Sequence, residues 1–136
     1  MEQRHDINFR SLIEEAEYAR TKAYAPYSNF KVGAALLTKR GRIFHGCNIE
    51  NSSFGATICA ERTAVFKAIS EGERDFLALA VVADTEGVCS PCGICRQVLS
   101  DFFTKDVQIC LANLKGDYEI FSISELLPLS FSLDTN

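Results

Sequence analysis

Two short segments of the sequence combine cysteines with an acidic residue at a spacing that suits metal-assisted chemistry. Cys59 stands two residues before Glu61, and Cys92 and Cys95 form a C-x-x-C pair further along the chain. Zinc takes three or four ligands in a tetrahedral array, and a catalytic site leaves one position for water. The three cysteines therefore predict one Zn²⁺ per chain, with Glu61 free to act as a base beside it.

The other readings of these cysteines are a redox pair and a disulfide framework. A reducing compartment favours metal binding or catalysis over disulfides for the six cysteines of the chain. Cys92 and Cys95 alone would suit a thioredoxin-like pair, but Cys59 adds a third metal ligand and so favours zinc. Cys89 forms an overlapping C-x-x-C pair with Cys92. We predict that Cys89 is not a ligand, with a structural or fourth-ligand role as the alternative.

The hydrophobic pattern predicts alternating helices and strands that must position these groups. Residues 38–41 form a glycine-containing connection of hairpin length, and a proline at residue 91 suits the start of a helix. We expect helices over residues 8–24, 58–70 and 91–103, strands over 31–38, 42–48, 76–83, 107–112 and 118–121, and a helical turn over 124–127.

This order of elements predicts an α/β fold, a three-layer α/β/α sandwich with a mixed sheet of about five strands. The strand and helix alternation over residues 42–112 implies right-handed crossovers and hence parallel pairing in that section. The second and third helices would then start on the same side of the sheet. Cys59 and Cys92 would meet there, where aligned amide dipoles favour thiolates. The length predicts one domain spanning residues 1–136.

Composition and charge exclude several classes of protein. The 136 residues are 47% hydrophobic and 24% charged, which excludes a disordered or low-complexity chain. The net charge of −4, with no basic run longer than Lys39-Arg40, argues against a nucleic-acid partner. No apolar stretch has the length of a membrane span, and residues 1–6 form no apolar signal segment. We therefore expect a cytoplasmic protein without a membrane partner.

Five ordered motifs contain or accompany the cysteines. They are Tyr-Ala-Pro-Tyr-Ser-Asn-Phe at 24–30, Val-Gly-Ala-Ala-Leu at 32–36, Gly-Cys-Asn-Ile-Glu-Asn at 46–51, Cys-Ala-Glu-Arg-Thr-Ala at 59–64 and Pro-Cys-Gly-Ile-Cys-Arg-Gln at 91–97. A metal-binding residue two positions before a Glu, followed later by P-C-x-x-C, is the signature of zinc deaminases. With these motifs the chain resembles the short, homotetrameric cytidine deaminases from Tyr24 almost to its C-terminus. Phe54 departs from the pattern, since relatives often have tyrosine there.

The resemblance implies hydrolytic deamination of cytidine and deoxycytidine to uridine and deoxyuridine, with release of ammonia, in pyrimidine salvage. Zinc would lower the pKa of a bound water, and Glu61 would take its proton and return protons to the ring nitrogen and the departing ammonia. Three thiolates outweigh the charge of Zn²⁺, so Arg62 and the two helix N-termini would offset the excess. By resemblance, the Ala60 amide would hold the pyrimidine carbonyl and the Ser90 carbonyl would accept from the amino group.

The resemblance also implies how the nucleoside sugar is bound. Asn48 and Glu50 are two residues apart at the end of a predicted strand, so both point to one face of the sheet. In the family these positions bind the ribose. The alternative is that Asn48 and Glu50 only stabilise a turn. Phe30 would pack near the base or the sugar. Phe131 resembles an aromatic residue that a neighbouring subunit contributes to the site.

A homotetramer with shared active sites follows from the same resemblance. The small residues Ala60, Ala64 and Ala68 would permit close approach of another copy, together with the loop of Phe54. The apolar residues 126–133 exceed what a free terminus usually carries, although packing on their own domain is the alternative.

Two other functions compete with cytidine deamination. The first is deamination of another cytosine nucleoside such as blasticidin S, which the ribose-binding form of residues 48–51 disfavours. The second is a non-catalytic structural zinc module, which would need a closed four-ligand site and no spare acid. Editing of nucleic acid would require a basic surface that this acidic chain lacks.

Overall fold

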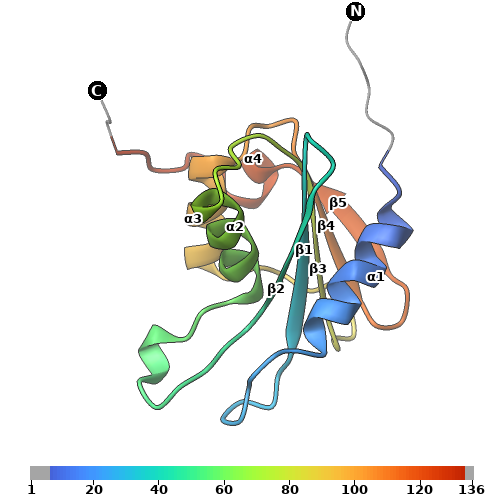
Figure 1. Cartoon of the computed structure of the whole chain (residues 1–136), viewed down its shortest axis with the longest axis vertical. Coiled ribbons are helices and arrows are strands. Elements are labelled where there is room, and N and C mark those ends of the chain that lie inside the picture. The colour runs from blue at the N-terminus through green and yellow to red at the C-terminus, as the bar shows by residue number, and fades with distance from the viewer. Residues whose placement is uncertain (1–6, 134–136) are drawn as a thin grey trace, which may run out of the picture.

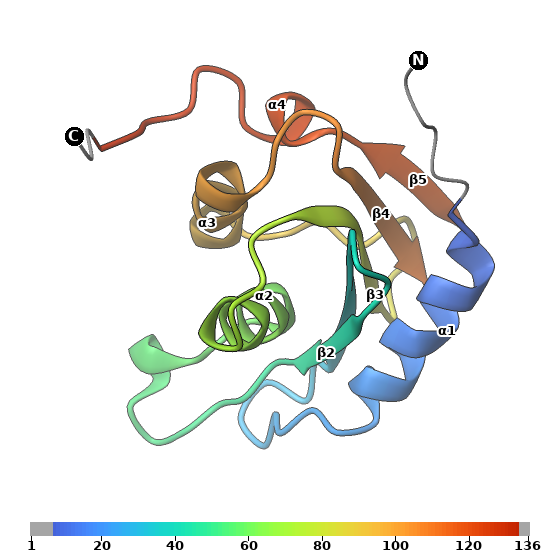
Figure 2. The ribbon, with the colours of Figure 1, turned by 45° about the horizontal axis from the view of Figure 1, so that its top comes forward.

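The chain folds as a mixed sheet of five strands between two layers of helices (Figures 1 and 2). In this computed structural model, α1 (Phe9–Arg20) covers one face, and α2 (Ala60–Ser70), α3 (Gly93–Phe102) and the short α4 (Ile123–Leu126) cover the other. The structure describes residues 7–133, so the segments 1–6 and 134–136 lie outside the described residues. The predicted three-layer α/β/α sandwich is confirmed.

The sheet has the strand order β2-β1-β3-β4-β5. Among the five strands within residues 7–133, β3 and β4 pair in parallel, β1 pairs with both β2 and β3 in antiparallel fashion, and β5 is antiparallel to β4. The prediction of parallel pairing throughout residues 42–112 is therefore wrong for β2, because β1 lies between β2 and β3. The strands are β1 (Val32–Thr38), β2 (Ile43–Cys47), β3 (Phe76–Ala83), β4 (Gln108–Asn113) and β5 (Tyr118–Phe121).

The first helix is shorter than the predicted span of 8–24 and ends at Arg20. The reason lies in Tyr24, whose N–H donates to the Asn48 carbonyl at 3.0 Å and whose carbonyl accepts from the Glu50 N–H at 2.8 Å. The segment after α1 therefore pairs with the chain that follows β2, a contact between residues distant in sequence. The other predicted elements agree within a residue or two.

Two glycines allow helices to pack tightly on opposite faces of the sheet. A Cβ at Gly33 of β1 would lie 2.0 Å from the Ala16 carbonyl oxygen of α1, and a Cβ at Gly46 of β2 would lie 2.2 Å from the Ala60 carbonyl oxygen of α2. Neither position can hold a side chain. The close approach at Gly46 fixes the first turn of α2, and hence the site, against the edge of the sheet.

The alanines of α2 pack in the hydrophobic core of their own chain. Ala60, Ala64 and Ala68 are fully buried in the core that α2 and α3 form with the sheet. The idea that they permit close approach of another copy is therefore wrong, because the sheet already occupies their face. Among the helices of residues 7–133, none has the length and apolar character that a bilayer span requires.

Candidate metal centre and active site

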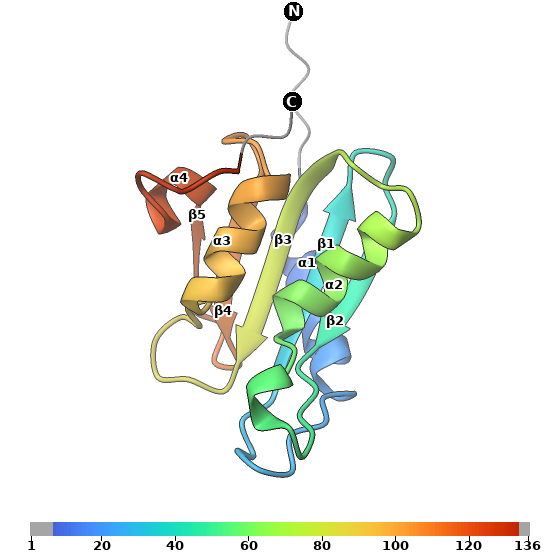
Figure 3. The same ribbon diagram turned by 90° about the vertical axis from the view of Figure 1, so that its left-hand side faces the viewer.

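The three predicted cysteine ligands converge where α2 and α3 begin, side by side on one face of the sheet (Figure 3). Cys59 is the N-cap residue of α2 and Cys92 that of α3. The Cys92 Sγ accepts from the Cys95 N–H at 3.4 Å, which turns it toward the start of its own helix. The sulfur atoms of Cys59, Cys92 and Cys95 all lie within 4.8 Å of one another.

The spacing of the sulfurs fits a tetrahedral metal. Zinc–sulfur bonds of about 2.3 Å at a tetrahedral angle place two sulfurs about 3.8 Å apart. The Sγ atoms of Cys59 and Cys92 are 3.8 Å apart. Three thiolates are a donor set that zinc prefers, and three protein ligands leave one position for water.

Arg62 supplies positive charge next to the thiols. Its Nη2 donates to the Cys59 Sγ at 3.2 Å and to the Thr57 carbonyl at 3.4 Å. The adjacent Cys95 thiol, and after it the hydrogen bonds from Arg62 and Cys92, lower the pKa of Cys59 to about 5, against the opposing effect of burial. One thiolate therefore forms readily in the chain, as metal binding requires.

Glu61 lies in the first turn of α2 with only 4% of its surface exposed. Burial, with a smaller contribution from the Cys59 thiolate, raises the pKa of its carboxyl to about 7, against the opposing effects of its own backbone N–H and of Arg62. A carboxyl near neutrality can both accept and donate a proton at physiological pH. Such a group beside a water-binding metal is suited to acid–base chemistry.

Cys89 lies outside the sulfur cluster. It is buried in the core with α2 and α3, and burial, followed by the charge of Glu61, raises the pKa of its thiol to about 12. Within residues 7–133, the only metal-ligand group of three or more consists of the three cysteines without Cys89. A closed four-cysteine site, as a structural zinc module would need, is therefore not formed.

The predicted sugar-binding residues come together on the segment that follows β2. The Asn48 side chain donates to the Phe30 carbonyl at 2.7 Å and accepts from the Val32 N–H at 2.9 Å. Glu50 is buried, and its carboxylate accepts from the Ser28 hydroxyl and from the N–H groups of Tyr27 and Ser28. These bonds fix the Phe30 loop, and the Ser28 hydroxyl contributes most to a lowered pKa of Glu50.

Ser90 lies in the loop before α3, where a side chain without a predicted role contacts it. Arg96 donates from Nη2 to the Ser90 Oγ at 2.6 Å and from Nε to the Pro91 carbonyl at 3.0 Å. Arg96 stands in the motif at 91–97, one helical turn after Cys92, but no role was predicted for it. Ser28 was likewise missed, since its partner Glu50 is distant in the chain.

Phe131 is 65% exposed, and Gln97 of α3 donates to its carbonyl at 2.7 Å. The segment after α4 lies toward the C-terminal end of α3, away from the end where the thiols meet (Figures 1 and 3). The structure thus groups the sulfur cluster with Glu61 and Arg62, and the Phe30 loop with Asn48 and Glu50. No hydrogen bond within residues 7–133 joins Phe131 to either group; its recorded contact is with Gln97.

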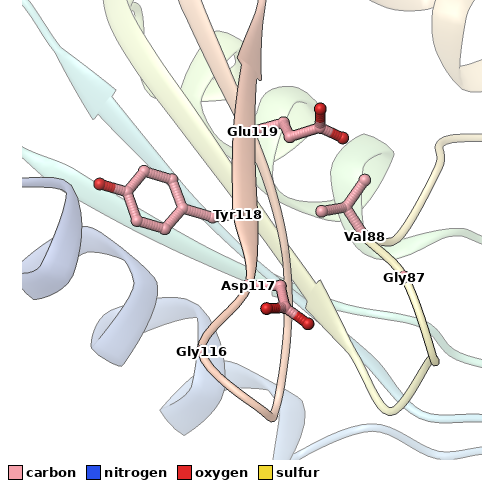
Figure 4. A pocket seen from close by; sticks show the side chains of 6 residues that line it. All are labelled: Gly87, Val88, Gly116, Asp117, Tyr118 and Glu119. Atoms are coloured by element: carbon pink, nitrogen blue, oxygen red, sulfur yellow. The ribbon is translucent and has the colours of Figure 1, made fainter.

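A separate hollow of about 440 Å³ lies between the loop that leaves β3 and the turn before β5. Figure 4 shows Tyr118 pointing away from the side occupied by Glu119 and Val88. None of the predicted site residues lines this hollow. Its lining consists of Gly87, Val88, Gly116, Asp117, Tyr118 and Glu119.

Three convergent thiols with a buried carboxyl beside them, on an α/β/α scaffold, define a zinc-dependent hydrolase. Comparison with known proteins identifies the family of hydrolases to which the chain belongs. The family model for the cytidine and deoxycytidylate deaminase zinc-binding region matches residues 8–111. The chain belongs to this deaminase family, and its metal is zinc.

Individual relatives agree with this assignment. The chain is 57% identical over 126 residues to a cytidine deaminase from Sporosarcina psychrophila, a match covering 93% of both chains. It superposes with a TM-score of 0.90 on the crystal structure of cytidine deaminase from Burkholderia pseudomallei, at 51% identity over 92% of this chain and 100% of the other. A blasticidin-S deaminase from Bacillus cereus is more distant, at 34% identity over 88% of this chain and 91% of its own.

Proposed function

We propose that the chain catalyses the hydrolytic deamination of cytidine and deoxycytidine to uridine and deoxyuridine, with release of ammonia, in pyrimidine salvage. The observation that carries the proposal is the buried Glu61 beside the three-thiol cluster. The 57% identity to a cytidine deaminase supports cytosine nucleosides as substrates, and the lower identity to a blasticidin-S deaminase disfavours that alternative.

Cys59, Cys92 and Cys95 would hold the metal. Zinc held there supplies a Lewis acid that lowers the pKa of water at the site. Glu61 takes a proton from this water at a carboxylate oxygen. It delivers this proton to the ring nitrogen while the water oxygen bonds to the ring carbon that bears the amino group. Glu61 then takes the remaining proton of that oxygen and passes it to the amino group, whose bond to carbon breaks, so that one water is consumed and one ammonia leaves.

The positive charge around the thiolates keeps the metal effective. Three thiolates outweigh the charge of Zn²⁺ and weaken its action on water unless donors offset them. Arg62 donates to the Cys59 sulfur at 3.2 Å, and the N-terminal ends of α2 and α3 point their amide dipoles at the same sulfurs. This arrangement supports a charge-tuning role for Arg62.

Main-chain groups at the two helix starts orient the base. Ala60 is the first residue of α2, so its N–H has no acceptor within the helix and is free for the pyrimidine carbonyl. In residues 7–133, no donor reaches the main-chain oxygen of Ser90, which is free to accept from the amino group of cytidine. Ala60 directly follows Cys59, and Ser90 lies two residues before Cys92.

Asn48, Glu50 and Phe30 bind the sugar side of the nucleoside. The Glu50 carboxylate is an acceptor that an incoming hydroxyl can complement, and the Asn48 amide retains one N–H beyond its bond to Phe30. Phe30 is 44% exposed and offers an apolar surface beside them. A hydroxyl-bearing sugar therefore suits this side of the site better than a free base.

The enzyme acts as a homotetramer in which Phe131 completes the site of a neighbouring copy. Phe131 is 65% exposed, and only its main-chain carbonyl is bonded, to Gln97 of α3, so its ring is available to a neighbouring copy. Large apolar side chains exposed around α2, α3 and the C-terminal segment support burial against further copies; they are Phe54, Phe66, Ile94, Phe131 and Leu133. Light scattering during turnover should give a tetramer, and an active monomer would contradict shared sites.

A cytoplasmic location suits the chemistry of the metal centre. Reducing conditions keep the three ligating thiols available for zinc instead of disulfides. The substrate and product are small nucleosides that require no membrane or nucleic-acid partner.

Ammonia release tests the proposed function. The purified zinc-loaded chain should release one ammonia per uridine formed from cytidine and per deoxyuridine formed from deoxycytidine. Blasticidin S, tested at the same concentration, should be turned over far more slowly. Absence of ammonia from both cytidine and deoxycytidine would refute the proposal.

A further inference from the structure

We infer that Arg96 is a positioning residue, which orients the Ser90 carbonyl toward the amino group of the substrate and ties this loop to the C-terminal segment. The inference rests on the proposed function, in which the Ser90 carbonyl accepts from that amino group. Arg96 itself contacts neither the thiols nor the substrate in this scheme.

The guanidinium of Arg96 forms hydrogen bonds on both sides of the Ser90–Pro91 peptide. Its Nη2 donates to the Ser90 Oγ at 2.6 Å, and its Nε donates to the Pro91 carbonyl at 3.0 Å. The peptide between these two acceptors carries the Ser90 carbonyl oxygen, to which no residue of 7–133 donates. Holding both flanks fixes the direction of that oxygen and leaves it open to a ligand.

The charged guanidinium of Arg96 bonds neutral oxygen atoms, the Ser90 hydroxyl and the Pro91 carbonyl. No carboxylate among residues 7–133 forms an ion pair with it. Its third bond runs from Nη1 to the Leu126 carbonyl at the end of α4, at 2.7 Å. A charged donor strengthens each of these bonds, and the planar fork serves three acceptors at fixed angles. A lysine cannot reproduce this geometry.

The opposite end of the same loop is held independently. Asn113 of β4 is 1% exposed and donates from Nδ2 to the carbonyls of Glu86 and Gly87, at 3.1 and 3.2 Å. The loop over residues 84–92 is thus anchored near its start by Asn113 and near its end by Arg96. The Cys89 N–H, one residue before Ser90, also donates to the Ala112 carbonyl at 3.4 Å, but within residues 7–133 Arg96 alone bonds both the Ser90 hydroxyl and the Pro91 carbonyl.

The bond to Leu126 connects this loop with the segment that carries Phe131. Gln97, the next residue of α3, donates to the Phe131 carbonyl at 2.7 Å. Arg96 and Gln97, which are neighbours on α3, therefore hold both the loop over residues 84–92 and the C-terminal segment. Loss of Arg96 should loosen the two segments together, and a change confined to one of them would not fit this connection.

The kinetic test compares a nucleoside that has the 4-amino group with one that lacks it. In Arg96→Ala, kcat/KM for cytidine should fall about tenfold, since charge-assisted bonds that orient a substrate contact are lost. The inhibition constant of pyrimidin-2-one ribonucleoside, which has hydrogen in place of the amino group, should change less than about twofold. Zinc content should stay at one per chain.

Two further variants make the test specific. Arg96→Lys keeps a cation and should restore part of the activity toward cytidine, because one ammonium can serve fewer of the acceptors. Arg74→Ala is the matched control, since Arg74 also donates to main-chain carbonyls, those of Ile69 and Glu73, but at the other end of α2. It should leave kcat/KM unchanged.

Hydrogen exchange provides a readout that does not depend on activity. Arg96→Ala should increase exchange in residues 84–92 and 122–131 and leave α1 unchanged. Equal losses for both nucleosides, no loss for cytidine, or unaltered exchange in these segments would overturn the inference. If the wild-type chain itself fails to deaminate cytidine, the proposed function fails instead, and the exchange result still judges the anchoring by Arg96.

Discussion

Two buried glutamates lie at opposite ends of α2 and have opposite electrostatic surroundings. Glu61, in the first turn, is 4% exposed, and Glu73, just beyond the last turn, is 3% exposed. Glu73 accepts from Arg40 at 2.6 Å and from Arg42 at 3.2 Å. These arginines, Arg40 above all, hold the pKa of Glu73 below its ordinary range, whereas burial raises the pKa of Glu61 to about 7.

The comparison separates the effect of burial from the effect of pairing. Both residues have little exposed surface, but burial dominates the shift at Glu61, whereas the hydrogen bond from Arg40 outweighs burial at Glu73. At one end, two arginines keep a permanent anion that connects the β1–β2 turn to the turn after α2. At the other end, Arg62 is directed at a cysteine sulfur, and the carboxyl can change protonation state. One glutamate is held as an anion between two arginines, and the other is suited to the proton transfer proposed for it.

The largest expected effect comes from removing the metal at the Glu61 end. Alanine at Cys59, Cys92 or Cys95 should abolish both zinc binding and turnover, because each supplies one of the three sulfurs. The melting temperature should also fall, since the metal connects the starts of two helices. Metal analysis, an ammonia assay and thermal unfolding measure the three consequences.

Cys89→Ala is the control for this series. Its thiol lies in the core outside the sulfur cluster, so the variant should retain one zinc per chain. Zinc loss in Cys89→Ala together with zinc retention in Cys59→Ala would contradict the ligand assignment.

The next effect is loss of proton transfer without loss of the metal. Glu61→Gln keeps the shape of the side chain but removes both base and acid, so kcat should fall by about three orders of magnitude or more. Zinc content and melting temperature should not decrease, because the variant removes a carboxyl that burial disfavours in its charged form. Near-normal turnover by Glu61→Gln would reject the catalytic role.

A third buried carboxylate, Glu50, resembles Glu73 in having hydrogen-bond partners, which belong to the loop over residues 27–30. Glu50→Ala should raise the KM for cytidine about tenfold to a hundredfold, because a sugar contact is lost and two N–H groups of the Phe30 loop lose their acceptor. Free cytosine lacks the sugar, so it should react poorly and equally with both proteins. Equal efficiency of the wild type on cytosine and cytidine would refute sugar binding here.

The sequence predicts the reactive end of the molecule better than the rest, for a physical reason. Cys59, Glu61 and Cys92 lie at helix starts, and local signals specify both the helices and the side of the sheet where they begin. The predicted end of α1 and the predicted parallel pairing of β2 were wrong because Tyr24 and β1 take partners far along the chain. Local periodicity contains no information on such partners.

The ion pairs of Glu73 with Arg40 and Arg42 were not predicted, for the same reason. Exposed arginines are usually solvated, and nothing local links Arg40 and Arg42 to a glutamate more than thirty residues away. Arg96 was also missed as a positioning residue, since two of its three acceptors are main-chain oxygens. Any residue type can supply such an acceptor, so no pattern marks it.

The smallest expected effect on turnover, and the sharpest test of the comparison, is Glu73→Gln. This variant should leave kcat/KM and zinc content unchanged. It should lower the melting temperature at pH 7, because Arg40 and Arg42 lose the negative charge of their partner. Glu71→Gln is the matched control, since Glu71 bonds Arg42 in an exposed pair and should change the melting temperature little.

The pH dependence of this destabilisation follows from the sign of the pKa shift. Because the pKa of Glu73 is lowered from its ordinary 4.5 in the folded chain, its stabilising contribution is complete above that value and is lost as the pH falls through the folded-state pKa. The gap in melting temperature between wild type and Glu73→Gln should thus be constant from pH 8 to about pH 6 and close in acid. Zinc release in acid affects both proteins and cancels in the difference. A gap that widens on acidification would show that Glu73 is not held as an anion, and the contrast with Glu61 would collapse.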